Sequence, residues 1–259
     1  ENRHIMQNLN YGVIGNCSTA ALISEKGAIE WLCFPEFDSP SVFAAILDRQ
    51  KGGHFGFKVT SDYKVTQSYV PHTNILSTHF ESEEGAFDVV DFMPCYPTSD
   101  GKDFYRPAEI YRYIRWAKGR PRMKVDYRPA PNYARGKTIY NVTSQYVETY
   151  SSVENKDRQY LYSSLDLKKV VNHDEITLEK DEFFLFSFNE KVIPVDIERE
   201  KLEYCRTLVY WLNWTDHAKR YTRYNEVIER SMLVLKLMTY RNGAVMAAVT
   251  TSLPETVGE

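Results

Sequence analysis

The stretch Tyr63-Lys-Val-Thr-Gln-Ser-Tyr-Val70 decides the fold class, because its large side chains alternate with polar ones. In an extended chain, Tyr63, Val65 and Tyr69 lie on one side, whereas Lys64, Thr66 and Ser68 lie on the other. The segment Met123-Lys-Val-Asp-Tyr127 repeats this pattern. A strand with one apolar and one polar face is typical of an antiparallel sheet with a core on one side.

Similar runs, rich in β-branched and aromatic residues, recur along the chain up to about residue 190. The further predicted strands are Thr19–Ile23, Ile29–Phe34, His54–Val59, Ile75–Phe80, Phe87–Phe92, Glu109–Ala117, Lys137–Val142, Gln145–Tyr150, Gln159–Tyr162, Glu175–Leu178 and Phe183–Phe188. No long helical pattern separates them, which argues against βαβ units and a parallel sheet. We therefore predict a mainly β protein built on a large antiparallel β-sandwich.

One short helix is expected within this region. Ser39-Pro40-Ser41 provides a residue suited to a helix N-cap, followed by a proline at the first helical position. Phe43, Ile46 and Leu47 follow at the i, i+3, i+4 spacing. This spacing predicts a helix over Val42–Leu47.

Beyond Pro194 the apolar residues change to helical spacing. From Lys201 to His217, leucine, valine and cysteine residues recur every three or four positions and predict one helix. A second helix is expected from Tyr224 to Tyr240, and its stretch Met232–Met238 is apolar nearly all round. Such a helix is buried on most sides, so it needs more partners than we expect this chain to supply.

Composition narrows the classes of function. The chain has 259 residues, with 32 Lys and Arg against 35 Asp and Glu, and a formal charge of −3. This balance argues against a nucleic-acid-binding protein. No apolar run approaches the roughly 18 residues of a membrane span, and the N-terminus lacks the apolar stretch of a signal peptide. Aromatic residues form 14% of the chain, which suits β-sheets, aromatic-lined sugar sites or both.

The sequence shows no metal or cofactor motif. The cysteines, Cys17, Cys33, Cys95 and Cys205, contain no Cys-x-x-Cys pair, and the six histidines show no metal-binding spacing. Scattered cysteines without a signal peptide indicate buried, reduced thiols in a cytoplasmic protein. We therefore assign no metal site. From the residues alone, the chain is a β-rich domain with a helical appendage and no visible active site.

Three segments near the N-terminus give a more specific indication. They are Tyr11-Gly-Val-Ile-Gly-Asn-Cys-Ser-Thr-Ala-Ala-Leu-Ile23, Gly27-Ala-Ile-Glu-Trp-Leu-Cys-Phe-Pro35 and Phe37-Asp-Ser-Pro-Ser-Val-Phe-Ala44. Together they resemble the opening of bacterial glycoside hydrolase family 15 proteins, which include glucoamylase-like, glucodextranase-like and trehalase-like enzymes. Asp88-Val-Val-Asp-Phe-Met-Pro94 and Pro131-Asn-Tyr-Ala-Arg135 are similar to later motifs of the family, although Asn132 and Ala134 replace its commoner Asp and Gly.

The resemblance implies an N-terminal β-sandwich, then a helical linker, then an α/α barrel. Arg230-Ser231 and Thr250-Thr-Ser-Leu-Pro-Glu255 are similar to the first barrel helix and to the loop that follows it. We therefore expect a sandwich domain over 1–199, a linker helix over 200–223, and the first helix and loop of a truncated barrel over 224–259. The segment before Met6 looks like a remnant, with Met6 as the native start.

The implied function is that of a non-catalytic N-terminal domain of an inverting α-glucosidase-type hydrolase. As in glucoamylase, the complete enzyme would remove terminal α-linked glucose from oligo- or polysaccharides; within the family the alternative is a trehalase. One carboxylic acid would protonate the leaving oxygen while a carboxylate activates water. The resemblance also implies that no metal or organic cofactor is needed. The family's two catalytic glutamates lie beyond the motifs present here, so we assign no catalytic residue and expect this chain alone to be inactive.

Phe37 and Asp38 are the first candidates for contact with an α-glucoside in the full-length enzyme. An aromatic ring beside a carboxylate is suited to stack on a sugar and to accept hydrogen bonds from its hydroxyls. The alternative is that Asp38 and Ser39 only cap the helix predicted after them. By resemblance, Thr251 and Ser252 lie in a loop near the active-site end of the barrel, and the alternative there is an ordinary polar turn.

Two hypotheses from other classes stay open. The aromatic surplus also suits a self-standing carbohydrate-binding module. The apolar helix over 224–240 could instead drive formation of a homo-oligomer.

The tryptophans have structural explanations in the sequence. Trp31 shares one face of its predicted strand with Ile29, which favours core packing over stacking on sugar. Trp211 and Trp214 lie three residues apart on the linker helix and are expected to pack between the domains.

Overall fold

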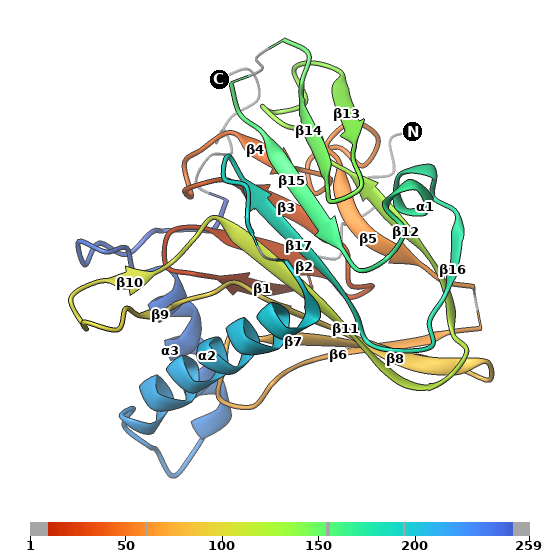
Figure 1. Cartoon of the computed structure of the whole chain (residues 1–259). Helices are drawn as coiled ribbons and strands as arrows, with labels where there is room; N and C mark the ends of the chain where they lie inside the picture. The colour runs from red at the N-terminus through yellow and green to blue at the C-terminus, as the bar shows by residue number, and fades with distance from the viewer. Residues whose placement is uncertain (1–9, 61, 154–155, 194, 251–259) are drawn as a thin grey trace, which may run out of the picture.

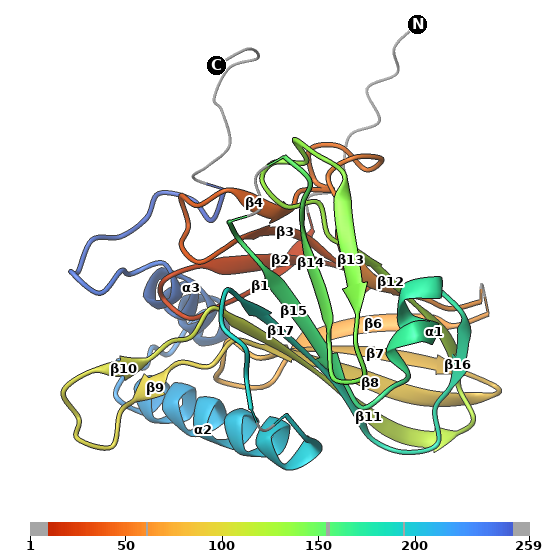
Figure 2. The ribbon, with the colours of Figure 1, turned by 45° about the horizontal axis from the view of Figure 1, so that its top comes forward.

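The computed structural model describes residues 10–60, 62–153, 156–193 and 195–250. Within these residues, two antiparallel sheets pack face to face, and helices from the last part of the chain lie against one side of the sandwich (Figures 1 and 2). The prediction of a mainly β protein with an antiparallel sandwich followed by helices is confirmed.

The first sheet has seven strands among the described residues, in the order β1-β2-β3-β5-β12-β16 with β4 also paired to β3. Their bounds are β1 Tyr11–Gly15, β2 Ala20–Ser24, β3 Ile29–Cys33, β4 Ser41–Phe43, β5 His54–Lys58, β12 Arg122–Arg128 and β16 Glu175–Thr177. Neighbouring strands that are adjacent in the chain are joined by short turns, as in the β1–β2 pair, where Tyr11 lies opposite Ser24.

The second sheet has eight strands among the described residues, in the order β13-β14-β15-β17-β11-β8-β7-β6. Their bounds are β6 Lys64–Tyr69, β7 Leu76–Ser82, β8 Gly85–Phe92, β11 Glu109–Gly119, β13 Thr138–Val142, β14 Val147–Ser151, β15 Gln159–Ser163 and β17 Glu182–Phe188. A small hairpin of β9 (Tyr96–Pro97) and β10 (Phe104–Tyr105) projects beside the sandwich.

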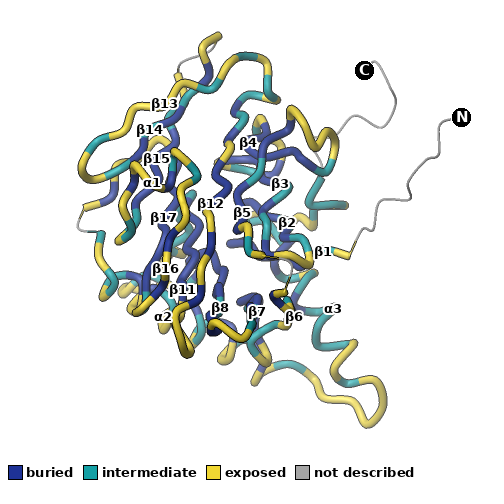
Figure 3. The backbone as a smooth tube through the Cα atoms, turned by 90° about the vertical axis from the view of Figure 1, so that its right-hand side faces the viewer, coloured by how far each residue is buried: buried dark blue, intermediate teal, exposed yellow. Residues whose placement is uncertain are grey.

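The main core fills the space between the two sheets, where buried residues of both face each other (Figure 3). Aromatic rings interlock there: Phe55 of the first sheet meets Phe184 of the second with ring centroids 5.3 Å apart, and Phe43 meets Phe186 at 5.5 Å. Such contacts add to the gain from burying apolar surface. The aromatic surplus of the sequence is largely used here.

The strand β17 is buried along its whole length, because both of its faces are covered. One face looks into the sandwich, and the other lies under the helix α2 (Ile197–Asp216). A second long helix, α3 (Asn225–Leu237), lies against the end of the sandwich near β1. The two helices predicted after Pro194 are thus confirmed, with α2 beginning four residues earlier than Lys201.

The helix predicted over Val42–Leu47 is wrong. Ser41–Phe43 form the strand β4, in which Phe43 pairs with Leu32 of β3, and a turn follows. Val42 and Phe43 are both buried, whereas Leu47 is 57% exposed. The local spacing resembled a helix face, but burial of consecutive side chains between sheet and core decides the conformation here.

Some elements lie outside the predicted ranges, namely β1, β9, β10 and the short helix α1 (Leu167–Asn172). Asp166 caps α1 by accepting a hydrogen bond from the backbone N–H of Lys168, at 2.9 Å. The helix packs its buried Leu167 and Val170 against β12. The division into domains at 199 and 223 stays a prediction.

Among the residues described, no helix is both long enough and apolar enough to cross a lipid bilayer.

Candidate functional site

Phe37 and Asp38, which the sequence predicts to contact substrate, differ in burial. Phe37 is 2% exposed and packs in an apolar cluster with residues of β8 and α3, while Asp38 lies on the surface. The helix that Asp38 would cap is absent, and the Ser39 hydroxyl instead accepts a hydrogen bond from the backbone N–H of Glu36 at 3.0 Å. The capping alternative is therefore wrong. Contact of Phe37 and Asp38 with substrate stays a prediction.

A polar cavity of about 240 Å³ lies beside this loop. Its walls are Ser18, Pro35, Glu36, Asp103, Phe104, Arg106, Ala108 and Arg241. Two carboxylates and two guanidinium groups in so small a volume suit a ligand rich in hydroxyls. Thr251 and Ser252, the other predicted substrate residues, lie outside the described residues.

The segment before them crosses the outer face of the first sheet. There the indole N–H of Trp31, a fully buried side chain, donates to the carbonyl of Val249 at 2.9 Å. Trp31 is thus buried by packing, as predicted, but it does not share the face of Ile29: Ile29 lies in the core between the sheets, whereas Trp31 packs in a separate cluster with Cys33 and Ala44.

Helix α2 lies on the second sheet with its polar side inward. Its buried residues are Glu200, Glu203, Thr207, Trp211 and Thr215. Three of the apolar residues that predict the helix lie on the opposite side: Leu202 is 47% exposed, Val209 63% and Leu212 39%. A surface helix ordinarily buries its apolar side. This helix therefore presents to the outside the face that usually contacts another layer of protein.

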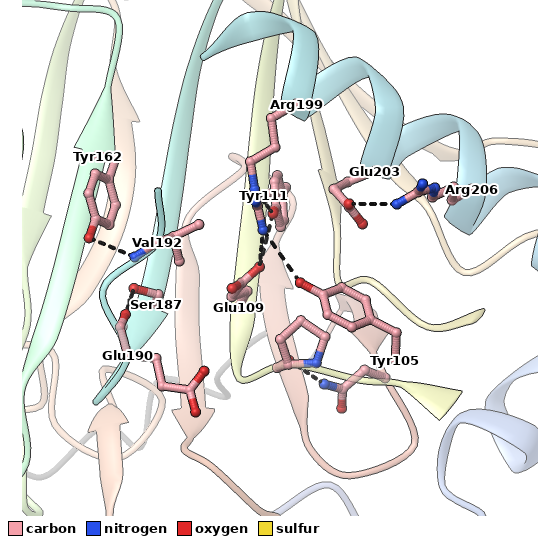
Figure 4. A network of polar contacts seen from close by, with 12 residues as sticks. Tyr105, Glu109, Tyr111, Tyr162, Ser187, Glu190, Val192, Arg199, Glu203 and Arg206 are labelled. Carbon is pink, nitrogen blue, oxygen red and sulfur yellow. Dashed lines mark hydrogen bonds and ion pairs between the residues drawn. The ribbon is translucent and has the colours of Figure 1, made fainter. Parts of the chain in front are cut away.

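Polar contacts hold the first turns of α2 against the sheet (Figure 4). Arg199 points its guanidinium between Tyr105, Glu109 and Tyr111, donating from Nε to the Tyr111 hydroxyl at 3.1 Å and from Nη2 to the Tyr105 hydroxyl at 3.4 Å. The Tyr111 hydroxyl in turn donates to Glu109 at 2.9 Å. Burial raises the pKa of Glu109, and burial with the nearby Glu109 charge raises the pKa of Tyr105 to about 12.

Two further glutamates of α2 differ in their partners. Glu203 accepts a hydrogen bond from the Tyr96 hydroxyl at 2.7 Å and lies 3.5 Å from Arg206. Glu200 is 1% exposed, and neither of its carboxylate oxygens has a hydrogen-bond partner among the described residues. Burial, together with the charges of Asp91, Glu203 and Glu109, raises the pKa of Glu200 well above its ordinary value. The face of α2 that lies on the sheet therefore contains buried ionisable groups that interact with one another, and it is not a simple apolar contact.

A groove of about 1280 Å³ follows the exposed side of α2. The hairpin β9–β10 and Met232 of α3 contribute to its other walls, and its aromatic lining consists of Tyr96, Phe104, Tyr105, Tyr210 and Trp214. The rings of Tyr210 and Trp211 pack edge to face with their centroids 4.9 Å apart, and the ring centroids of Trp211 and Trp214 lie 6.5 Å apart. Grooves of this size with an aromatic lining accept a ligand or a segment of protein.

Helix α3 is fixed to the sandwich by Arg230. Its guanidinium donates to the carbonyl of Thr73 at 2.8 Å and to the side chain of Asn74, and it lies 3.8 Å from the ring centroid of Tyr69. Asn74 returns a hydrogen bond to the carbonyl of Leu233 at 3.0 Å. The turn between β6 and β7 thus binds the middle of α3 through these hydrogen bonds.

The end of α3 fits against β1 at Gly15. A Cβ at this position would lie 2.6 Å from the Thr19 carbonyl oxygen and 2.8 Å from Cδ2 of Leu237, closer than side chains approach. Leu237 itself is fully buried. Glycine at 15 therefore makes room for the helix, and Gly15 with Leu237 and Arg230 defines a seat for α3.

Apart from Trp211 and Trp214, whose packing between domains stays a prediction, sequence reasoning missed the residues that build these surfaces. Glu200, Glu203, Thr207 and Trp211 follow a helical spacing of their own, which was the available signal for the inward face of α2. The sequence indicates Arg230 only as part of a motif, because a lone arginine on a helix does not reveal its partner. In the part of the chain that is described, no group of His, Cys, Asp and Glu side chains is arranged to hold a metal ion.

Known proteins align with this chain over nearly its whole length. The chain is 31% identical to a trehalase of Thermoplasma acidophilum over 92% of its residues, 33% identical to trehalase 1 of Sulfolobus acidocaldarius over 96%, and 28% identical to a trehalase of Mycolicibacterium smegmatis over 95%. It covers 41%, 41% and 40% of these relatives, and so spans about two fifths of their length.

The trehalase relatives support the expectation from the sequence in part. They support the resemblance to glycoside hydrolases, but not specifically to glucoamylase. They include archaeal proteins, so a bacterial origin is not shown. Residues 7–155, more than half of the chain, match the family described as "Trehalase-like, N-terminal". The chain therefore belongs to the family of trehalase-like N-terminal domains.

Proposed function

We propose that this chain is the N-terminal part of a trehalose-hydrolysing glycoside hydrolase, in which the sandwich and α2 support a helical catalytic domain. The observation that carries the proposal is the orientation of α2. Its polar face lies on the sheet, while Leu202, Val209 and Leu212 face outward. Apolar residues exposed along a helix favour a second protein layer over them. In the complete protein, that layer is the part corresponding to the three fifths of the relatives that this chain does not cover.

The seat of α3 supports the same proposal. Arg230, Asn74 and Leu237 anchor this helix to the sandwich, yet Val227 is 66% exposed and Leu235 56% exposed. A helix that is anchored on one side and apolar on the other suits the first member of a helical barrel. The sandwich would then set the position of the barrel through α3.

Trehalose is the substrate that the relatives favour, because the similar curated proteins are named trehalases. The glucoamylase-like activity expected from the sequence becomes the alternative. In either case, the proposed reaction is hydrolysis with inversion by two carboxyl groups, supplied by the catalytic domain. Asp38 would then contribute to the wall of the substrate pocket beside the polar cavity at Glu36 and Arg241, and contact of Phe37 with substrate would require the loop to open, because this side chain is buried.

The proposal is tested by extending the protein through the coding sequence that follows Glu259. The extended protein and the 259-residue chain are assayed with α,α-trehalose, maltose and soluble starch. We expect trehalose hydrolysis by the extended protein alone. Preference for maltose or starch would support the glucoamylase alternative, and a coding sequence that stops at Glu259 would contradict the proposal.

A pair of variants tests the role of α2 in the extended protein. Val209→Asp places a charge in the exposed apolar face, and we expect it to lower trehalose turnover at least tenfold by loosening the catalytic domain. Lys201→Asp changes a charge on an exposed polar position of the same helix and should leave turnover within twofold. Equal activity of both variants would show that the exposed face of α2 is not covered.

The groove lined by aromatic rings supports a second candidate, a carbohydrate-binding module. Tyr96, Tyr105 and Trp214 would supply stacking surfaces, with Arg199 and Glu203 as polar partners. Calorimetry of the 259-residue chain with trehalose and maltoheptaose separates the two candidates. Saturable heat that Trp214→Ala abolishes would favour the binding module; absence of heat is expected if the groove holds protein.

A further inference from the structure

Two cysteines that are far apart in the sequence have their thiols in contact. The Sγ atoms of Cys17 and Cys95 lie 3.9 Å apart, although the residues are separated by 78 positions. Cys17 follows β1 in the turn to β2, and Cys95 follows the end of β8. Both are free thiols, 2% and 1% exposed. The other cysteines differ: Cys33 packs in a separate cluster with Trp31 and Ala44, and Cys205 is exposed on α2.

The pair lies where four parts of the fold meet. The Cys17 thiol donates to the carbonyl of Lys236 in the last turn of α3, at 3.4 Å. The Cys95 thiol interacts with the hydroxyl of Tyr210 on α2. Any covalent change at this pair therefore occurs directly beneath both helices.

The surroundings make the two thiols chemically unequal. The hydrogen bond from Cys95, with the charges of Lys236 and Arg106, lowers the pKa of Cys17 against the effect of burial. The hydrogen bond to Cys17 and burial raise the pKa of Cys95. Since the thiolate is the nucleophile in cysteine chemistry, Cys17 is suited to react first and Cys95 to remain a thiol beside it.

We propose that Cys17 and Cys95 are a modification site, a thiol pair that a peroxide converts into an internal disulfide. The Cys17 thiolate attacks one oxygen of hydrogen peroxide, the O–O bond breaks, and Cys17 becomes a sulfenic acid while the departing hydroxide takes a proton to form water. The Cys95 sulfur then attacks the Cys17 sulfur, and the sulfenic oxygen leaves as a second water with the Cys95 proton. Two thiols are oxidised and one peroxide is reduced to two waters.

The geometry allows this closure with a small movement. A disulfide needs its sulfurs at about 2.05 Å, so each sulfur moves by about 1 Å from the observed 3.9 Å separation. The S–H that Cys17 donates to the Lys236 carbonyl in the last turn of α3 is lost in the reaction, and because both thiols are buried, the peroxide reaches them only when the surrounding structure opens. The reaction thus connects the redox state of the surroundings with the seat of α3, whatever the catalytic activity of the complete protein.

The first experiment needs no change in the core. Cys205→Ser removes the exposed thiol, which would otherwise form links between molecules. The folded chain with this substitution is treated with hydrogen peroxide, then blocked with iodoacetamide and digested without reduction. We expect a loss of about two mass units, a Cys17–Cys95 linked peptide, and faster migration on a non-reducing gel because a 78-residue loop is closed. Oxidation without this linked peptide, or no oxidation under peroxide that oxidises free cysteine, would overturn the proposal.

The order of the two steps is tested by single variants in the same Cys205→Ser background. In Cys95→Ser, the sulfenic acid at Cys17 has no thiol to close on, and dimedone should label it. In Cys17→Ser, Cys95 should be labelled at least tenfold more slowly. Cys33→Ser is the matched control and should still form the Cys17–Cys95 link. Equal labelling of Cys95 and Cys17 in the two variants would overturn the assignment of Cys17 as the attacking thiol.

Discussion

Arg112 and Asp91 form an ion pair in the middle of the sandwich, with both side chains fully buried. Arg112 donates from Nε to Oδ1 of Asp91 at 2.7 Å and from Nη2 to Oδ2 at 3.2 Å. The same guanidinium donates to the carbonyls of Phe55 and Gly27 across the core. One side chain of the second sheet thus satisfies polar groups of the first and ties the two sheets together.

Replacing Arg112 by Met should lower the free energy of unfolding by about 3–5 kcal/mol, because it leaves the Asp91 carboxylate buried without a partner. The double variant Arg112→Met, Asp91→Leu removes both charges and should recover a large part of this loss. Urea unfolding followed by tryptophan fluorescence measures both. Equal destabilisation by the single and double variants would show that packing, and not the unpaired charge, determines the effect.

The sequence predicts the sheets well and this ion pair not at all. Tyr63, Val65 and Tyr69 alternate with polar residues, and such alternation survives any tertiary context because one face must be buried. Arg112 occupies an inward position of β11, where its neighbours in the chain give no sign of a partner 21 residues away. The pairing depends on which strands lie opposite each other, which alternation does not specify.

The candidate site, too, has a part that the sequence predicts and a part that it does not. The existence of α2 follows from apolar spacing, but that spacing favours burial of Leu202 and Val209, and the structure buries Glu200 and Glu203 instead. The sheet beneath the helix and the β9–β10 hairpin supply Arg199 with tyrosine and glutamate partners, and only the folded topology brings these together. Sequence reasoning therefore reached the elements and missed the surface that they build.

Leu237→Ala should loosen α3 from its seat. Deletion of a fully buried leucine side chain costs about 2–5 kcal/mol, and the loss falls on the contact with Gly15. Hydrogen exchange of the α3 amides should accelerate at least tenfold, while β8 and β11 keep their protection. Leu235→Ala is the matched control, since Leu235 is 56% exposed on the same helix. If both variants accelerate exchange equally, helix propensity explains the effect and the seat does not.

Glu200 should make the protein less stable as the pH rises from about 4.5. Burial raises its pKa in the folded state, so in this range the folded protein holds a proton that the unfolded chain has lost. Stability then falls by up to about 1.4 kcal/mol per pH unit until the folded-state pKa is passed. Glu200→Gln should flatten this slope, and the exposed Glu198→Gln should not. Parallel stability curves for Glu200→Gln and the unchanged protein between pH 5 and 8 would refute the assignment.

Asp126 should act with the opposite sign. Burial opposes its ionisation, but hydrogen bonds from Lys58, His54 and Arg128 outweigh burial and lower its pKa. Its contribution is present above the unfolded-state pKa near 3.9 and is lost as the pH falls below it. Asp126→Asn should cost about 1 kcal/mol at pH 7, since Lys58 and Arg128 are more than half exposed and water screens them. As the pH falls from about 4 toward 2, the difference in stability between the variant and the unchanged protein should shrink steadily.

Self-association of the 259-residue chain should depend on the outward face of α2. Leu202, Val209 and Leu212 together form an apolar strip that nothing in the described part of the chain covers. Such a strip favours contact between copies at high concentration. Sedimentation velocity should therefore show a concentration-dependent rise in mass, and Val209→Asp should weaken the association at least tenfold. Leu235→Asp changes the exposed side of α3 and so distinguishes the two helices. If Leu235→Asp weakens the association and Val209→Asp does not, the predicted homo-oligomer forms through α3.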